Sequence, residues 1–180
     1  MSAPRSPGVR PGHAVVIERE PYDSPVAREL AGAMMAEVDE RYAADGPADG
    51  DAPEVVAAHR VRTEQVTPPR GVFVIAWADG DPVGCGAVRP LLGGPADVAE
   101  IKRMYTTPEA RGRGISRALL ARLEAEAVGF GYRRVQLESG LRQPEALRLY
   151  ETAGYHRIPD FGQYAGDELT VCFAKDLRPA

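Results

Sequence analysis

Two glycines and two arginines stand together in the segment Arg111–Gly114, which reads Arg-Gly-Arg-Gly. A strand pattern ends near Thr106 before this segment, and a helix pattern begins at Ile115 directly after it. A tight turn between a strand and a helix directs backbone N–H groups and the positive helix end toward one point, which suits a phosphate or diphosphate. Glycines let phosphates approach the backbone, and arginines add charge-assisted hydrogen bonds. The segment therefore predicts an anion site, with a plain turn as the alternative.

Other phosphate-binding motifs do not fit this segment. No third glycine follows at the spacing of the dinucleotide-binding fingerprint. The Gly-Lys-Ser/Thr of a P-loop is missing as well. Because a Gly-x-Gly before a helix is a weak signal by itself, the neighbouring segments have to decide what the turn binds.

The turn resembles the R-x-x-G-x-G/A signature of the GNAT acetyltransferase superfamily, with Arg111, Gly114 and Ser116 in the three fixed places. Ser116 stands where Gly or Ala is usual, and it is small enough to be tolerated. The resemblance covers about residues 98–175 and includes the segments Glu100–Tyr105, Gly131–Leu137 and Gln143–Tyr150, followed by Ala153–Tyr155.

This resemblance implies that acetyl-CoA is the cosubstrate. It implies that the backbone of Met104, Tyr105 and Thr106 pairs with the pantetheine arm like an added strand. The diphosphate would be held at Arg111, Gly112, Arg113, Gly114, Ile115 and Ser116. Gln143 would either hydrogen-bond the pantetheine or only cap the helix that starts at Pro144.

The resemblance also implies direct attack of a primary amine on the thioester. An alkyl ammonium has a pKa of about 10.4, so its proton must be removed. Glu100 is the candidate base, directly or through water; the alternatives are an exposed strand carboxylate or a partner for Lys102. Tyr150 is the candidate general acid for the departing thiolate, and its alternative is a half-buried aromatic residue. Phe161 and Tyr164 either line the acceptor site or only pack their loop.

Strands and helices alternate only in the second half of the chain, which favours a mixed sheet. Apolar residues every four positions between Val26 and Val38 predict a helix. Asp79-Gly80-Asp81 predicts a hairpin between two strands. The expected strands are 14–18, 72–78, 82–88, 98–106, 134–139 and 168–174, of which 72–78 and 82–88 form the hairpin. The other expected helices are about 53–65, 115–129 and 144–154. The resemblance implies an α/β (α+β) GNAT fold with a mostly antiparallel mixed sheet of about seven strands, splayed between strands 4 and 5.

Composition narrows the class of protein. The chain has 180 residues, of which 44% are hydrophobic and 27% charged, as in an ordinary globular domain. We expect a flexible tail over 1–12 and a single domain over 13–178. The net charge of −4 gives no sign of a nucleic-acid partner. No apolar run of membrane-spanning length and no signal sequence is seen, so we expect a cytoplasmic protein.

Cysteine and histidine are too scattered to predict a metal site. Cys85 and Cys172 lie in strand patterns without metal-ligand spacing, so we expect both to be buried apolar side chains. The sequence thus predicts an N-acetyltransferase for a small-molecule or peptide amine, acting as a monomer or homodimer without metal or membrane. A transferase for another acyl-CoA and a non-catalytic acyl-CoA-binding module are the alternatives.

Overall fold

A seven-stranded mixed sheet forms the frame of the protein. The computed structural model describes residues 15–43, 60–162, 165–166 and 168–177. The strand order is β1-β2-β3-β4-β5-β7-β6, with every neighbouring pair antiparallel except β4 and β5. The strands are β1 (Val15–Arg19), β2 (Val72–Ala78), β3 (Asp81–Pro90), β4 (Val98–Thr106), β5 (Arg134–Gly140), β6 (His156–Ile158) and β7 (Thr170–Asp176). The prediction of a mixed, mostly antiparallel sheet is confirmed.

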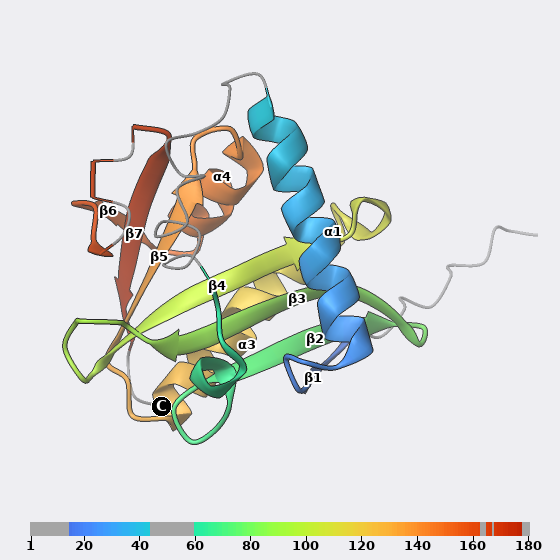
Figure 1. Ribbon diagram of the computed structural model, residues 1–180, viewed down its shortest axis with the longest axis horizontal. Coiled ribbons are helices and arrows are strands. Elements are labelled where there is room, and N and C mark those ends of the chain that lie inside the picture. The colour runs from blue at the N-terminus through green and yellow to red at the C-terminus, as the bar shows by residue number, and fades with distance from the viewer. Residues whose placement is uncertain (1–14, 44–59, 163–164, 167, 178–180) are drawn as a thin grey trace, which may run out of the picture.

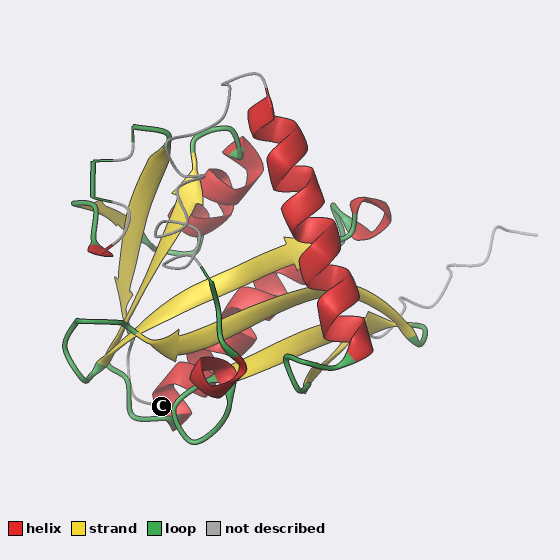
Figure 2. Cartoon of the chain, viewed as in Figure 1, coloured by secondary structure: helices red, strands yellow, loops and turns green. Residues whose placement is uncertain are grey.

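Helices cover both faces of this sheet (Figures 1 and 2). α1 (Pro25–Tyr42) lies in front of β2, β3 and β4 in this view, and α3 (Ile115–Gly129) lies behind them. α4 (Pro144–Thr152) packs on the same face as α3, because its Tyr150 belongs to the hydrophobic cluster that contains the buried leucines of α3. Short 3-10 segments, η3 (Thr63–Val66) and η4 (Pro108–Ala110), complete the described elements.

The alternation of side chains along β2 explains why the sheet is covered on both faces. Val72 and Val74 belong to the cluster beneath α3, whereas Phe73 and Ile75 pack with Ala27 and Leu30 of α1, in the cluster on the other face. Since successive strand residues point to opposite faces, a strand that is apolar throughout needs a layer on each side. The continuous apolar run of β2 is therefore buried on both faces of the sheet.

The element bounds follow the sequence patterns closely in the central and C-terminal parts of the chain. β2, β4 and α3 span the expected residues, and α4 begins at Pro144 as expected. The expected helix over about 53–65 falls mostly outside the described residues, and at its described end the structure has the 3-10 segment η3 instead. The expected tail over 1–12 also lies outside the described residues.

β4 and β5 meet at a short parallel seam. Their register pairs are Val98 with Arg134, Ala99 with Val135, and Glu100 with Gln136. β4 continues six residues beyond this seam to Thr106, and β5 continues four residues to Gly140. The two strands thus diverge toward their carboxyl ends, as the resemblance implied, and the opening between them receives the site described next.

Candidate active site

A β-bulge interrupts β4 beside the opening. In the register of β3 and β4, Cys85 faces Tyr105 and Ala87 faces Lys102, so two residues of β4 stand opposite Gly86. Arg103 has a φ of 58°, a left-handed conformation that is uncommon for residues with a side chain. A bulge leaves backbone groups out of the regular ladder and re-aims side chains. The bulge therefore takes Arg103 and Met104 out of the regular register with β3, although Cys85 Sγ of β3 still donates to the backbone oxygen of Arg103 at 3.4 Å.

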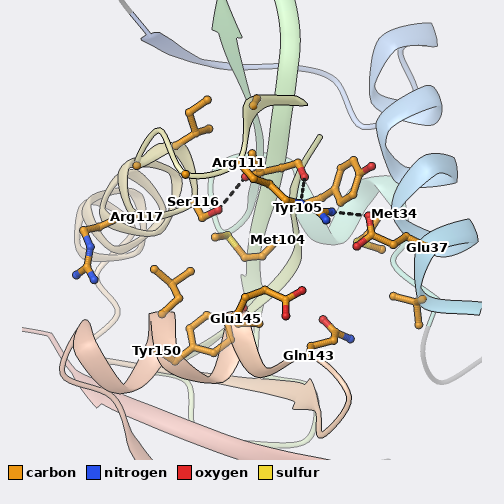
Figure 3. Close-up of a pocket in the computed structure, with 18 of the residues that line it drawn as sticks. Met34, Glu37, Met104, Tyr105, Arg111, Ser116, Arg117, Gln143, Glu145 and Tyr150 are labelled. Atoms are coloured by element: carbon orange, nitrogen blue, oxygen red, sulfur yellow. Dashed lines mark hydrogen bonds and ion pairs between the residues drawn. The ribbon is translucent and has the colours of Figure 1, made fainter. Parts of the chain in front are cut away.

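The opening between β4 and β5 leads into a pocket of about 330 Å³, a size typical of small-molecule sites. Its walls come from α1, the end of β4, the following loop, the start of α3, and α4 (Figure 3). Because α1 lies on one face of the sheet and α3 and α4 on the other, the pocket extends past the end of β4 from one face of the sheet to the other. Its lining includes Met104, Tyr105, Thr106, Arg111, Gly112, Gly114, Ile115, Ser116, Gln143 and Tyr150.

The N-terminus of α3 forms one wall of this pocket. Gly114 is the residue before the helix and has a φ of 80°, which glycine adopts without the strain that a side chain would add. Among the residues that the structure describes, no side chain caps this helix end with a hydrogen bond. The backbone N–H groups of the first turn thus remain available to an anion, and the helix dipole favours negative charge there. This is the geometry that the glycine-rich turn predicted.

Ser116 has a structural role that its place in the signature did not reveal. Its Oγ lies 2.9 Å from Oγ1 of Thr106, the last residue of β4. This hydrogen bond joins the end of the strand to the first turn of α3. The hydroxyl that replaces the usual Gly or Ala is therefore paired within the protein, and it fixes the two elements that border the anion site.

The side chain of Arg111 extends toward α1 instead of folding over the start of α3. Its Nε donates to the backbone oxygen of Thr106 at 3.2 Å, and its Nη2 lies 2.5 Å from Oε2 of Glu37 (Figure 3). The predicted phosphate contact of this guanidinium thus has a competitor in the carboxylate of Glu37. Arg113 is exposed and does not line the pocket, so any contact it makes with a cofactor lies outside this cavity.

Tyr150 lies on the α4 side of the pocket, across from Tyr105 and Arg111 (Figure 3). Its side chain is only 5% exposed, and its ring packs against Tyr155 and Phe173 with centroids 5.8 and 5.9 Å away. Burial and the negative charge of Glu138 raise the pKa of Tyr150. The hydroxyl is therefore protonated at neutral pH and can donate a hydrogen bond into the pocket.

Gln143 precedes α4 and lines the pocket without capping the helix through its side chain. The side chain instead hydrogen-bonds the hydroxyl of Tyr42, the last residue of α1. The same hydroxyl accepts a hydrogen bond from the backbone N–H of Arg142 at 3.1 Å. Tyr42 reaches this place because Gly140 has no side chain, since a Cβ there would overlap its hydroxyl. Sequence reasoning missed Tyr42, which joins the end of α1 to the start of α4.

Glu100 is placed differently from a general base that serves the pocket. Its carboxylate is 2% exposed and does not line the pocket. Arg89, which is fully buried on the neighbouring strand, donates from Nε to Oε2 of Glu100 at 2.8 Å. Lys102 Nζ lies 3.5 Å from the other carboxylate oxygen. These contacts support the structural alternative, a buried partner for cationic side chains, because both carboxylate oxygens face cations of the sheet and the residue does not line the pocket.

Neither of the two residues predicted to line the acceptor site, Phe161 and Tyr164, is found at the pocket in the part of the chain that the structure describes. Phe161 lies in the loop after β6 and does not line the pocket, and Tyr164 is outside the described residues.

Cys85 and Cys172 are buried and form no disulfide, as expected. In the part of the chain that the structure describes, no group of three or more His, Cys, Asp or Glu residues could hold a metal ion. Over the same residues, no helix is long and apolar enough to cross a membrane.

Comparison with known proteins agrees with this geometry. Residues 33–155 match the model of the Acetyltransferase (GNAT) family. An IAA acetyltransferase from Azospirillum brasilense is 34% identical over 128 residues, which cover 71% of this chain and 82% of the relative. The chain belongs to the GNAT family of acetyltransferases. The matched region contains α4 and the whole glycine-rich turn, so the resemblance stated for these segments is confirmed.

Other GNAT proteins share the fold over nearly the whole chain. A structure described as an acyl-CoA N-acyltransferase from Klebsiella pneumoniae has a TM-score of 0.71 and 26% identity, and the match covers 91% of this chain and 98% of that one. An aminoglycoside 6'-N-acetyltransferase in complex with coenzyme A has a TM-score of 0.62 and 18% identity over 92% of this GNAT chain and 98% of its own. At that identity the likeness shows the fold alone.

Proposed function

We propose that this GNAT protein transfers the acetyl group of acetyl-CoA to a primary amine of a small molecule or peptide. The observation that carries the proposal is the pocket between α1, the end of β4, the start of α3 and α4. It joins the uncapped N-terminus of α3, the bulged backbone of β4 and the hydroxyl of Tyr150 within one cavity. These three features suit the diphosphate, the pantetheine amides and the sulfur of one extended thioester cofactor.

The proposed cofactor placement follows from the donors on each wall. The first-turn N–H groups of α3 bind the diphosphate, and Ser116 stays paired with Thr106 at the same place. The pantetheine arm runs along β4, where the bulge frees backbone groups near Met104. Gln143 faces the arm from the α4 side. Most of these contacts are made by backbone atoms, so the cofactor is selected by geometry more than by side-chain charge.

In the proposed reaction, the neutral amine attacks the thioester carbonyl, a C–N bond forms and the C–S bond breaks. A backbone N–H of β4 polarises the carbonyl oxygen, a contribution of about 10²–10³ in rate. Tyr150 donates its proton to the departing sulfur, the nitrogen loses its proton to water, and Tyr150 regains a proton from water, so that the amide and the free thiol are the products. We give the removal of the proton from nitrogen to no side chain, because the carboxylate of Glu100 is held by Arg89 and Lys102.

The acceptor class rests on relatives. The matched proteins include an IAA acetyltransferase and, at 30% identity over 110 residues, a human N-acetylaspartate synthetase. The second match covers only 36% of that protein. Their names describe different acceptors, so we propose no narrower acceptor for this chain than a primary amine of a small molecule or peptide. Incubation of pooled amines with acetyl-CoA and the protein, followed by mass spectrometry for a mass increase of one acetyl group, identifies it.

Binding of the cofactor is tested by calorimetry with Ser116→Glu. The substitution places a carboxylate in the first turn of α3, where negative charge favours the helix but repels a diphosphate. Ala118→Glu is the matched control, since Ala118 is exposed on the same helix and does not line the pocket. We expect wild type and Ala118→Glu to bind acetyl-CoA, and Ser116→Glu to lose binding at least tenfold. A wild-type protein that binds no acetyl-CoA contradicts the proposal.

A further inference from the structure

A chain of ion pairs closes the rim of the pocket. Nη2 of Arg111 lies 2.5 Å from Oε2 of Glu37, and Nη2 of Arg41 lies 2.7 Å from Oε1 of Glu37. The same atom of Arg41 lies 2.5 Å from Oε1 of Glu145. The chain therefore connects the loop after β4 to α1, and α1 to α4. All four side chains line the pocket, and Figure 3 shows Arg111 extending toward Glu37 on α1.

Glu37 stands at the centre of this chain. It is 23% exposed and contacts both guanidinium groups, one on its own helix and one across the pocket rim. Burial raises the pKa of Glu37, but hydrogen bonds from Arg111 and Arg41 outweigh this effect and lower the pKa below its ordinary value. Glu37 is thus ionised at neutral pH. Two arginines at the entrance of an anion-binding pocket are each neutralised by a carboxylate of the protein.

A diphosphate that enters the pocket competes with Glu37 for the guanidinium of Arg111. Arg111 belongs to the loop that leads to the start of α3, and it lines the same pocket as that helix end, so its guanidinium can reach the proposed diphosphate site if it leaves Glu37. A guanidinium pairs with phosphate as readily as with carboxylate, but one face of its fork serves one partner at a time. Since Nη2 of Arg111 contacts the carboxylate of Glu37, a phosphate can bind to Nη2 only after this ion pair has broken.

We propose that Glu37 restrains cofactor affinity by competing with the diphosphate of CoA for Arg111. Binding then exchanges carboxylate for phosphate on the guanidinium and uncouples the C-terminal half of α1 from the cofactor loop. This inference rests on the proposed function, because it requires that the pocket binds CoA. It adds a residue of α1, outside the glycine-rich turn, that sets how tightly the cofactor is held.

The experiment measures the Kd of CoA by calorimetry for wild type, Glu37→Gln and Glu40→Gln at low and high salt. Glu40 is exposed on the same helix, and its side chain enters none of the ion pairs found among the described residues. We expect Glu37→Gln to lower the Kd about fivefold at low salt, the equivalent of about 1 kcal/mol for one partly exposed ion pair. The gain should shrink at high salt, and Glu40→Gln should match wild type.

Glu37→Asp separates the contact from the net charge. It keeps the carboxylate but shortens the side chain by one methylene, so the carboxylate no longer reaches Arg111. We expect this variant also to bind CoA more tightly than wild type, and it serves as the test if Glu37→Gln does not fold. Wild-type binding with unchanged or weaker binding by both variants overturns the inference and leaves the proposed function intact. Failure of wild type to bind CoA overturns both.

Discussion

Replacement of Arg89 by Met tests whether Glu100 is a structural residue or a catalytic base. Arg89 is fully buried on β3, and its cross-strand neighbour Glu100 on β4 is 2% exposed. Arg89 Nε donates to Glu100 at 2.8 Å, and Nη1 donates to the side chain of Gln65 at 2.9 Å. Nη2 lies 2.7 Å from the same carboxylate, although without hydrogen-bond geometry. The variant removes all of these contacts and leaves a buried carboxylate behind.

The expected cost follows from the burial of the pair. Removal of one partner of a buried ion pair destabilises a protein by about 3–5 kcal/mol, because the remaining charge is uncompensated. Lys102 stays 3.5 Å from Glu100 and compensates part of the charge, so we expect the lower end of this range. For a domain of this length, 1 kcal/mol shifts the Tm by about 2–4 °C. Urea denaturation should therefore show a loss of about 3 kcal/mol, and Tm should fall by about 6–12 °C.

The double variant Arg89→Met with Glu100→Leu separates the two roles of Glu100. Loss of both charges removes the uncompensated carboxylate, so we expect at least half of the lost stability to return. We also expect the turnover of the double variant to stay within a few fold of wild type once the acceptor is known. A general base contributes about 10²–10⁴ in rate. A single variant that costs under 1 kcal/mol, or a double variant that loses turnover a hundredfold, refutes the structural role of Glu100.

Two further substitutions test the α4 side of the pocket. Tyr150→Phe removes the protonated hydroxyl but keeps the packed ring, so kcat should fall about 10²-fold or more while the Kd of acetyl-CoA is unchanged; equal turnover, measured by thiol release, would exclude the acid role. Gly140→Ala places a Cβ within 1.8 Å of the hydroxyl of Tyr42, so the side chain must leave its site beside α4. We expect a loss of about 1–3 kcal/mol in denaturant unfolding, with a much smaller effect of the same change in a Tyr42→Ala background, which removes both the hydroxyl and the ring; an equal loss in both backgrounds would show that this overlap is not the cause.

Local signals in the sequence were sufficient for most of the fold. β2, β4 and α3 are each bounded by a turn, a glycine or a proline and carry either a continuous apolar run or a periodic apolar pattern, so the expected and observed bounds agree. The strand, glycine turn and helix around Gly114 were predictable for the same reason, because their signals adjoin in the sequence, and the binding of an anion there stays a prediction. The resemblance to GNAT proteins then supplied the place of Tyr150, which the structure does bring into the pocket.

Features set by distant residues were not predictable in this way. The bulge at Arg103 has no glycine to mark it, and it arises from the register between β3 and β4. Glu100 reads as a solvent-facing strand residue, because its partner Arg89 is a cross-strand neighbour that only the pairing of the sheet reveals. Arg111 reads as a phosphate ligand, because Glu37, 74 positions earlier, is brought to it only by the packing of α1.

The short seam between β4 and β5 also has a consequence for how the chain assembles. Among the described strands, β4 and β5 form the single parallel pair of the sheet. Their three register pairs join the half-sheet of β1 to β4 to the half-sheet of β5, β7 and β6. Antiparallel neighbours such as β2 and β3 close through short turns, whereas a parallel pair requires the crossover through α3 to form first. We therefore expect each half-sheet to gain its hydrogen bonds before the seam closes. In native-state hydrogen exchange, the seam amides should open at a lower free energy than those of β2 and β3.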